Sequence, residues 1–176
     1  VAGQRDSEVV QEDLAIDWKR SDYDPYGRTK KFCEHMAREL LPNVQKTFFR
    51  PSIVMGDSRF GETTQFDMVR AFCVLVDLPV IPFSGDVRLD IVNADWVGRA
   101  IATIHMKKQP KWDIYHLSSG ESSKRAIEIA QAILRGSGRR LPVFVAQLEN
   151  PFGSIMNNLA SMKSKNALTL IGSLFK

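Results

Sequence analysis

The sequence predicts an α/β fold with a largely parallel sheet. Segments whose apolar residues recur at helical spacing alternate with short apolar runs along most of the chain, an order typical of helices packed on parallel strands. With 176 residues, of which 44% are hydrophobic and 25% charged, the chain is long and apolar enough to bury a sizeable core. No internal repeat or low-complexity tract interrupts this pattern.

Composition and charge exclude two classes of partner. The net charge is +4 and the basic residues are scattered, whereas a nucleic-acid surface needs clustered Lys and Arg interleaved with exposed aromatics. No apolar run reaches the roughly 18 residues needed to span a bilayer. We therefore expect neither a nucleic-acid nor a membrane partner, and the cytoplasm is the default location.

Cysteine and histidine usage gives no sign of a metal site. Cys33 and Cys73 each lie in an apolar helical pattern and are predicted to be buried free thiols. The three histidines, His35, His105 and His116, are widely separated, so each is interpreted as a surface or packing residue.

Residues 25–41 are predicted to form a helix. Asp24 can accept a hydrogen bond from a free N–H of the first turn, Pro25 suits the first helical position, and Pro42 ends the segment. An apolar stripe is expected to pack this helix on the sheet. Its members are Phe32, Cys33, Met36, Ala37, Leu40 and Leu41.

Tyr26 and Lys30 are four residues apart, so they lie on one face of that helix, near a border of the apolar stripe. An ammonium near a phenol favours the phenolate, and such a tyrosine can exchange a proton with an alcohol or a carbonyl. Taken alone the spacing is a weak signal, because a surface tyrosine beside a solvated lysine has the same pattern.

Residues 44–49 are predicted to form a parallel strand covered on both faces, which Pro51 ends because it has no N–H to donate. Ligands of such sheets bind beyond the carboxyl ends of the strands. The segment in that place is Pro51, Ser52, Ile53 and Val54. A strand end followed by an ordinary loop fits the same residues.

The middle of the chain alternates loops and helices. A glycine-bearing loop over residues 56–64 precedes a helix over 65–78, whose run 71–76 is apolar all round. We expect core packing there, with an acyl-chain channel as the less favoured alternative. Residues 79–83 hold two prolines, which restricts them to an edge strand or a lining loop.

The remaining elements follow the same alternation. A strand over 90–92 leads into a helix over 96–106 that Asp95 is expected to cap, and a strand over 113–117 follows. Ser122 or Ser123 is expected to cap a helix that ends at Leu134. A short apolar run over 141–145 and a weak helix over 151–162 complete the prediction.

The run 26–30 (Tyr-Gly-Arg-Thr-Lys) and the amphipathic helix after it resemble the catalytic helix of the extended short-chain dehydrogenase/reductase superfamily. Segments 47–56 and 88–97 resemble that family's strand beside the nicotinamide and its short strand entering a helix through an aspartate. The resemblance covers residues 1–120 and is strongest to the fatty-acyl/thioester reductase branch. It implies the C-terminal part of a doubly wound Rossmann-type parallel sheet with a small substrate-binding region.

The resemblance also implies roles for individual residues. Tyr26 would be the acid/base, and Lys30 would hold the nicotinamide ribose hydroxyls. The segment from Pro51 to Val54 would flank the nicotinamide ring of NAD or NADP. Arg88 would contact a substrate phosphate, although a plain surface arginine explains it equally well.

The reaction implied is hydride transfer to or from a carbonyl or alcohol carbon of a small-molecule substrate, with an acyl thioester as one candidate. A sugar-nucleotide epimerase or dehydratase is one alternative, and a non-catalytic dinucleotide sensor or inactive fragment is another. A homodimer is left open.

Two features of that family are missing from this sequence. They are the opening glycine-rich turn that cradles the cofactor pyrophosphate and the serine or threonine upstream of the tyrosine. We therefore expect residues 1–176 to be the C-terminal portion of a single domain, inactive alone and without measurable dinucleotide affinity. Its substrate-binding region is expected mainly in residues 56–92 and 119–165.

Overall fold

The computed structural model describes residues 10–12, 16–19, 25–60 and 66–151. The chain divides into two compact units, Val1–Ser52 with Trp96–Leu117, and Ile53–Asp95 with Ser118–Lys176. Four two-stranded ladders are present in the described part of the chain, three of them parallel. The predicted α/β class with mainly parallel pairing is confirmed.

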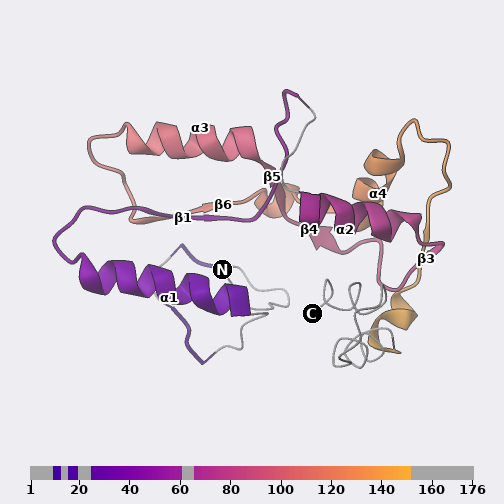
Figure 1. The fold of residues 1–176 in the computed structure, drawn as a ribbon, viewed down its shortest axis with the longest axis horizontal. Helices are drawn as coiled ribbons and strands as arrows, with labels where there is room; N and C mark the ends of the chain where they lie inside the picture. The colour runs from indigo at the N-terminus through magenta and orange to yellow at the C-terminus, as the bar shows by residue number, and fades with distance from the viewer. Residues whose placement is uncertain (1–9, 13–15, 20–24, 61–65, 152–176) are drawn as a thin grey trace. The chain divides into compact units, whose positions relative to one another are not determined.

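The first unit is built on one parallel ladder. Strand β1 (Phe48–Pro51) pairs with β6 (Ile114–Leu117), with Phe48 opposite Ile114 and Pro51 opposite Leu117. Helix α1 (Pro25–Leu40) and helix α3 (Ala94–His105) flank this ladder from opposite sides (Figure 1). Ile114, Leu117 and Val97 are the buried apolar residues of this unit among the residues described.

The second unit contains the other three ladders. Strand β2 (Ile53–Met55) pairs with β5 (Ile91–Asn93), and β3 (Val80–Ile81) with β8 (Val143–Phe144), both in parallel. The antiparallel ladder joins β4 (Arg88–Leu89) to β7 (Lys124–Arg125). The two-residue β3 agrees with the edge strand or lining loop predicted for residues 79–83.

Two helices form the apolar core of the second unit. Helix α2 (Phe66–Asp77) and helix α4 (Ala126–Leu134) bring Val76, Ala130 and Leu134 into one buried cluster. Ile133 and Phe144 pack against it. The predicted end of helix α4 at Leu134 is confirmed, and helix α2 contributes Val76 to the core, as expected for its apolar run.

The prediction for the strand before Pro51 was partly wrong. The strand begins at Phe48, not at residue 44, and includes Pro51. Ser52 N donates to Leu117 O at 3.0 Å, so the ladder tolerates the missing proline N–H. One residue later the chain takes a new partner, because Ile53 N donates to Asp90 O at 3.2 Å. Pro51 therefore marks a change of partner strand.

The predicted helix over residues 25–41 is confirmed within one residue, but most of its predicted apolar stripe is exposed in this chain, with only Met36 and Ala37 half-buried. Phe32 and Leu40 are 54% and 68% exposed, and Cys33 is exposed instead of buried. The side of α1 toward β1 carries Glu34 and Arg38. Both have partners on β1: Glu34 accepts from Arg50, and the Arg38 guanidinium lies 5.1 Å from the ring centroid of Phe48.

Two predicted helix caps were also wrong. Helix α3 begins at Ala94, so Asp95 lies within its first turn. Its carboxylate accepts hydrogen bonds from Ser58 N at 3.0 Å and Ser58 Oγ at 2.8 Å. Asp95 therefore holds the loop after β2.

The start of α4 also differs from the prediction, because the residues before it form a strand. Residues 124 and 125 pair with β4 before the helix begins, which moves its start beyond both predicted serines. Ser122 lies in the 3₁₀ helix η1 (Gly120–Ser122), and Ser123 Oγ donates to Gly120 O at 2.5 Å. The Glu128 carboxylate instead accepts a bond from Arg125 N at 2.8 Å.

Several sequence predictions fall on other parts of the chain. Residues 152–162 of the predicted last helix and most of residues 1–21 lie outside the described residues, as do residues 61–64 of the loop after β2. In the described ranges, no helix is long and apolar enough to cross a membrane. The same ranges contain no group of three or more His, Cys, Asp or Glu arranged to hold a metal ion.

Candidate active site

Tyr26 and Lys30 lie together at the start of α1. Lys30 Nζ is 5.1 Å from the centroid of the Tyr26 ring, so the shared face expected from their spacing is present. Both side chains are exposed, Tyr26 to 63%. The first turn is tied by Thr29 Oγ1, which donates to Tyr26 O at 2.7 Å. The phenol and the ammonium are thus accessible to a ligand.

The segment expected to flank a nicotinamide is divided between the two units. Pro51 and Ser52 belong to the first, whereas Ile53 and Val54 belong to β2 of the second and are half-buried. The Ser52 hydroxyl is buried and makes no hydrogen bond within the described part of the chain. An unpaired buried hydroxyl costs free energy unless a ligand or a water satisfies it.

Arg88 lies on β4 in the second unit, where its guanidinium donates hydrogen bonds to backbone carbonyls of residues 121–123. Its Nη1 donates to Ser123 O at 2.7 Å and to Glu121 O at 3.1 Å. These bonds give Arg88 a structural task within this unit. The substrate-phosphate contact stays a prediction.

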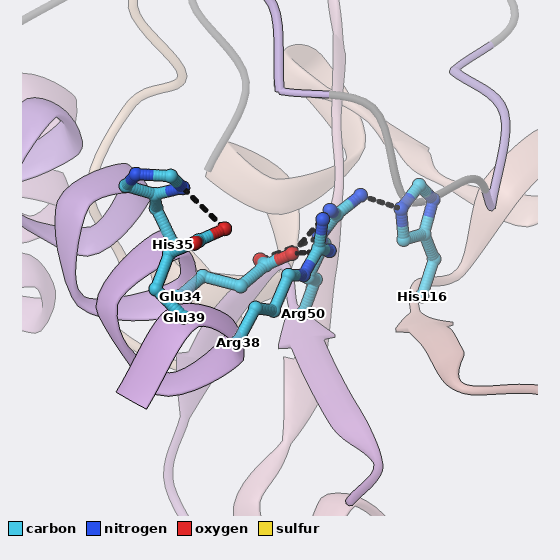
Figure 2. Close-up of polar contacts among 6 residues, drawn as sticks. All are labelled: Glu34, His35, Arg38, Glu39, Arg50 and His116. Carbon is cyan, nitrogen blue, oxygen red and sulfur yellow. Dashed lines mark hydrogen bonds and ion pairs between the residues drawn. The ribbon is translucent and has the colours of Figure 1, made fainter. Parts of the chain in front are cut away.

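A charge cluster that the sequence did not reveal joins α1 to β1. Arg50 donates two hydrogen bonds to the Glu34 carboxylate, from Nε to Oε2 at 3.0 Å and from Nη2 to Oε1 at 2.7 Å. Arg38 pairs with the same carboxylate, and Arg50 Nη1 lies 3.3 Å from His116 Nε2 on β6. Figure 2 shows Arg50 between Glu34 and His116.

Burial and charge act on Glu34 in opposite directions. Burial raises the pKa of its carboxyl, but the Arg50 hydrogen bond and the charges of Arg50 and Arg38 lower it by more. The net pKa is lowered, so the carboxylate is ionised at neutral pH and the pair is an ion pair. The spacing of Glu34 and Arg38 could have suggested their own contact, but no local signal points to Arg50.

Comparison with known protein families decides the assignment. Residues 3–101 match the model of the NAD-binding family described as male sterility protein. The chain belongs to this family. A search of curated proteins gives no significant match.

Solved structures with a similar fold include two reductase-type domains and an epimerase. The terminal R domain from the myxalamid PKS-NRPS biosynthetic pathway matches with a TM-score of 0.72 and 25% identity over 98% of this chain. UDP-glucuronic acid 4-epimerase from Bacillus cereus, in complex with UDP-glucuronic acid and NAD, matches with a TM-score of 0.56 and 21% identity over 83% of the chain. The reductase domain of the aureusimine biosynthetic cluster matches with a TM-score of 0.53 and 17% identity over 86%.

These matches confirm the resemblance to extended short-chain dehydrogenase/reductases and the Rossmann-type fold class. This chain spans 42%, 46% and 38% of the three matched chains, respectively. It therefore corresponds to less than half of each of these proteins.

The donor set at α1 fits one end of an NAD molecule. An ammonium and a phenol, both exposed and on one helix face, can hydrogen-bond ribose hydroxyls. For the pyrophosphate end, the sequence has no glycine-rich turn leading into a helix. The residues present thus fit the nicotinamide half of the cofactor.

Proposed function

We propose that this chain is the C-terminal portion of an NAD(P)-dependent oxidoreductase of the extended short-chain type, which reduces or oxidises a carbonyl or alcohol carbon. The observation that carries the proposal is the exposed Tyr26–Lys30 pair on α1 in a chain of an NAD-binding family. The similarity to a terminal R domain, 25% identical over 98% of this chain, favours an acyl thioester as substrate.

In this mechanism the protein places the reacting carbon and manages the proton. When bound, a reduced nicotinamide supplies the hydride. The Tyr26 hydroxyl donates its proton to the carbonyl oxygen of the substrate as the carbon is reduced, and Lys30 stabilises the phenolate left behind. With an acyl thioester the product of this step is a hemithioacetal, whose carbon–sulfur bond then breaks to release the thiol and an aldehyde. Lys30 would also donate to the ribose hydroxyls, and Pro51 and Ser52 would form one wall of the nicotinamide site.

The second compact unit is proposed to bind the substrate. It covers the two segments, 56–92 and 119–165, in which the sequence predicts that region. Within this unit, the remaining donors of Arg88 would meet a substrate phosphate. The choice between NAD and NADP, the cytoplasmic location and a homodimer stay predictions from the sequence.

Replacement of Tyr26 by Phe in the full-length protein tests the proposal. It removes only the hydroxyl, so turnover should fall by about 100-fold or more, while cofactor affinity, measured by titration of intrinsic fluorescence, stays within a few-fold. Tyr115→Phe is the matched control, because its hydroxyl accepts a bond from Trp112 N at 3.1 Å on the strand ladder. Near-normal turnover in Tyr26→Phe would refute the role of Tyr26.

A sugar-nucleotide epimerase is the second candidate, suggested by the likeness to an epimerase in complex with NAD. At 21% identity that likeness supports the fold alone. An epimerase regenerates its cofactor within each cycle, whereas a reductase consumes it. Stoichiometric loss of added reduced cofactor supports the reductase, and turnover without net loss supports the epimerase. A folded protein that binds cofactor without turnover would indicate a sensor.

A further inference from the structure

We propose that the ion pair between Glu34 and Arg50 is a positioning element of the active site, which fixes the orientation of α1 relative to β1. The inference rests on the proposed function, because it assigns the pair a task in that reaction. Neither residue touches the reacting atoms in this scheme. Both act through the backbone elements that carry Tyr26, Lys30 and Ser52.

One end of the ion pair is linked to the proposed catalytic residues by an unbroken helix. Glu34 follows Lys30 by four residues, as Lys30 follows Tyr26, and α1 is continuous over Pro25–Leu40. At about 1.5 Å of rise per residue, Glu34 lies about 6 Å along the axis from Lys30. A helix transmits a rotation at one turn directly to the next, so a bond at Glu34 also orients Tyr26.

The other end is linked to the proposed nicotinamide wall by a few backbone bonds. Arg50 directly precedes Pro51 and Ser52 and lies opposite His116 in the β1–β6 register. The Ser52 N–H is fixed to Leu117 O at 3.0 Å. A displacement of the Arg50 backbone would therefore move the wall.

The geometry of the ion pair suits this task. Two parallel bonds between a planar guanidinium and a carboxylate fix both distance and angle, whereas an ammonium makes a point contact. The side chains of Glu34 and Arg50 are 13% and 16% exposed, so water competes little for these bonds. Phe32 and Leu40 are exposed, which leaves Met36 and Ala37 as the half-buried members of the apolar stripe of α1.

A purely structural ion pair is the competing explanation, and the two make different predictions. A structural pair changes turnover only through the fraction of folded protein. A positioning pair changes turnover in protein that is fully folded. The test must therefore restore stability without restoring the geometry.

The double replacement Glu34→Leu with Arg50→Leu approaches this requirement, since substituting apolar residues for a buried ion pair is often neutral or stabilising. It also removes the carboxylate that Arg38 contacts, so turnover of the full-length protein is measured well below the thermal midpoint of the variant, where all of it is folded. The turnover number should fall about 10-fold or more, because small misplacements of reacting groups are costly, with a smaller change in KM. Wild-type turnover in the folded double variant would overturn the proposal.

Arg50→Lys is the second variant, in case the double variant does not fold. It keeps the charge but loses the two-bond geometry. Turnover should again fall in folded protein, and wild-type turnover would count against positioning.

A readout without turnover separates this inference from the proposed function. The sequence has three tyrosines, so a ¹³Cζ-tyrosine label gives three resonances, and Tyr26→Phe assigns one of them to Tyr26. In the 176-residue chain, the Tyr26 resonance should shift in the double variant. It should not shift when the exposed pair Asp77 and Arg139 is replaced by two leucines. An unshifted Tyr26 resonance in the double variant overturns positioning, even if the full-length protein shows no activity.

Discussion

Helix α1 of the first unit and helices α2 and α4 of the second are held by different interactions. In the second unit, α2 and α4 share a buried apolar cluster of Val76, Ala130 and Leu134. In the first unit, α1 is held to β1 by the half-buried Glu34–Arg50 ion pair. The hydrophobic effect is non-directional, whereas an ion pair with two hydrogen bonds has one good geometry. The position of α1, which carries the proposed catalytic residues, therefore depends on the direction of these hydrogen bonds as well as on the burial of apolar surface.

The chain offers separate probes for the two units. All three tryptophans, Trp18, Trp96 and Trp112, belong to the first unit, so tryptophan fluorescence reports on that unit. Far-UV circular dichroism reports on helices in both. A difference between the two signals during unfolding of the 176-residue chain measures how independent the units are.

The largest expected effect is on the apolar cluster. Leu134 is 7% exposed, and Leu134→Ala should lower the free energy of unfolding by about 2–5 kcal/mol. In urea titrations, the circular dichroism midpoint should fall further than the fluorescence midpoint. Equal shifts would show that the units unfold as one, which would break the comparison.

A smaller effect is expected from Glu34→Ala, which leaves the Arg50 charge half-buried without its partner. We expect a loss of about 1–3 kcal/mol in the free energy of unfolding, seen mainly in tryptophan fluorescence. Asp77→Ala is the control, because it breaks the exposed pair with Arg139 in the second unit, where such pairs contribute little. Equal losses in the two variants would show that burial of the first pair is unimportant.

The smallest expected effect is a pH dependence of the first unit. The pKa of Glu34 is lowered below its ordinary value of 4.5, so the folded state binds this proton less readily than the unfolded state. The stabilisation is complete above pH 4.5 and is lost as the pH falls through the lowered value. Fluorescence-detected stability should fall less steeply with acid in Glu34→Gln, and an unchanged slope would contradict this.

Local patterns predicted most of the elements. The proline at position 25 and the helical spacing up to Leu40 were enough to place α1, and the apolar run before Leu117 was enough to place β6. The face of α1 that packs on β1 could not be predicted, because it depends on Arg50, a residue 16 positions after Glu34. Apolar periodicity indicated a different face of the helix, most of which is exposed in this chain.

Only those features of the candidate site that depend on local spacing could be predicted from the sequence. The spacing of Tyr26 and Lys30 is local and fixes their common face in any helix. The start of α3 depends on Gly56, whose carbonyl accepts Ala94 N at 2.8 Å from a distant part of the chain. Pairings of this length carry no signature in a single sequence.

The contact between Arg50 and His116 has a consequence for the imidazole. A guanidinium has only hydrogens to offer, so a hydrogen bond across the 3.3 Å between Arg50 Nη1 and His116 Nε2 requires the tautomer of His116 whose hydrogen is on Nδ1. Ring nitrogen shifts in ¹⁵N spectra would report directly on whether the arginine is in place.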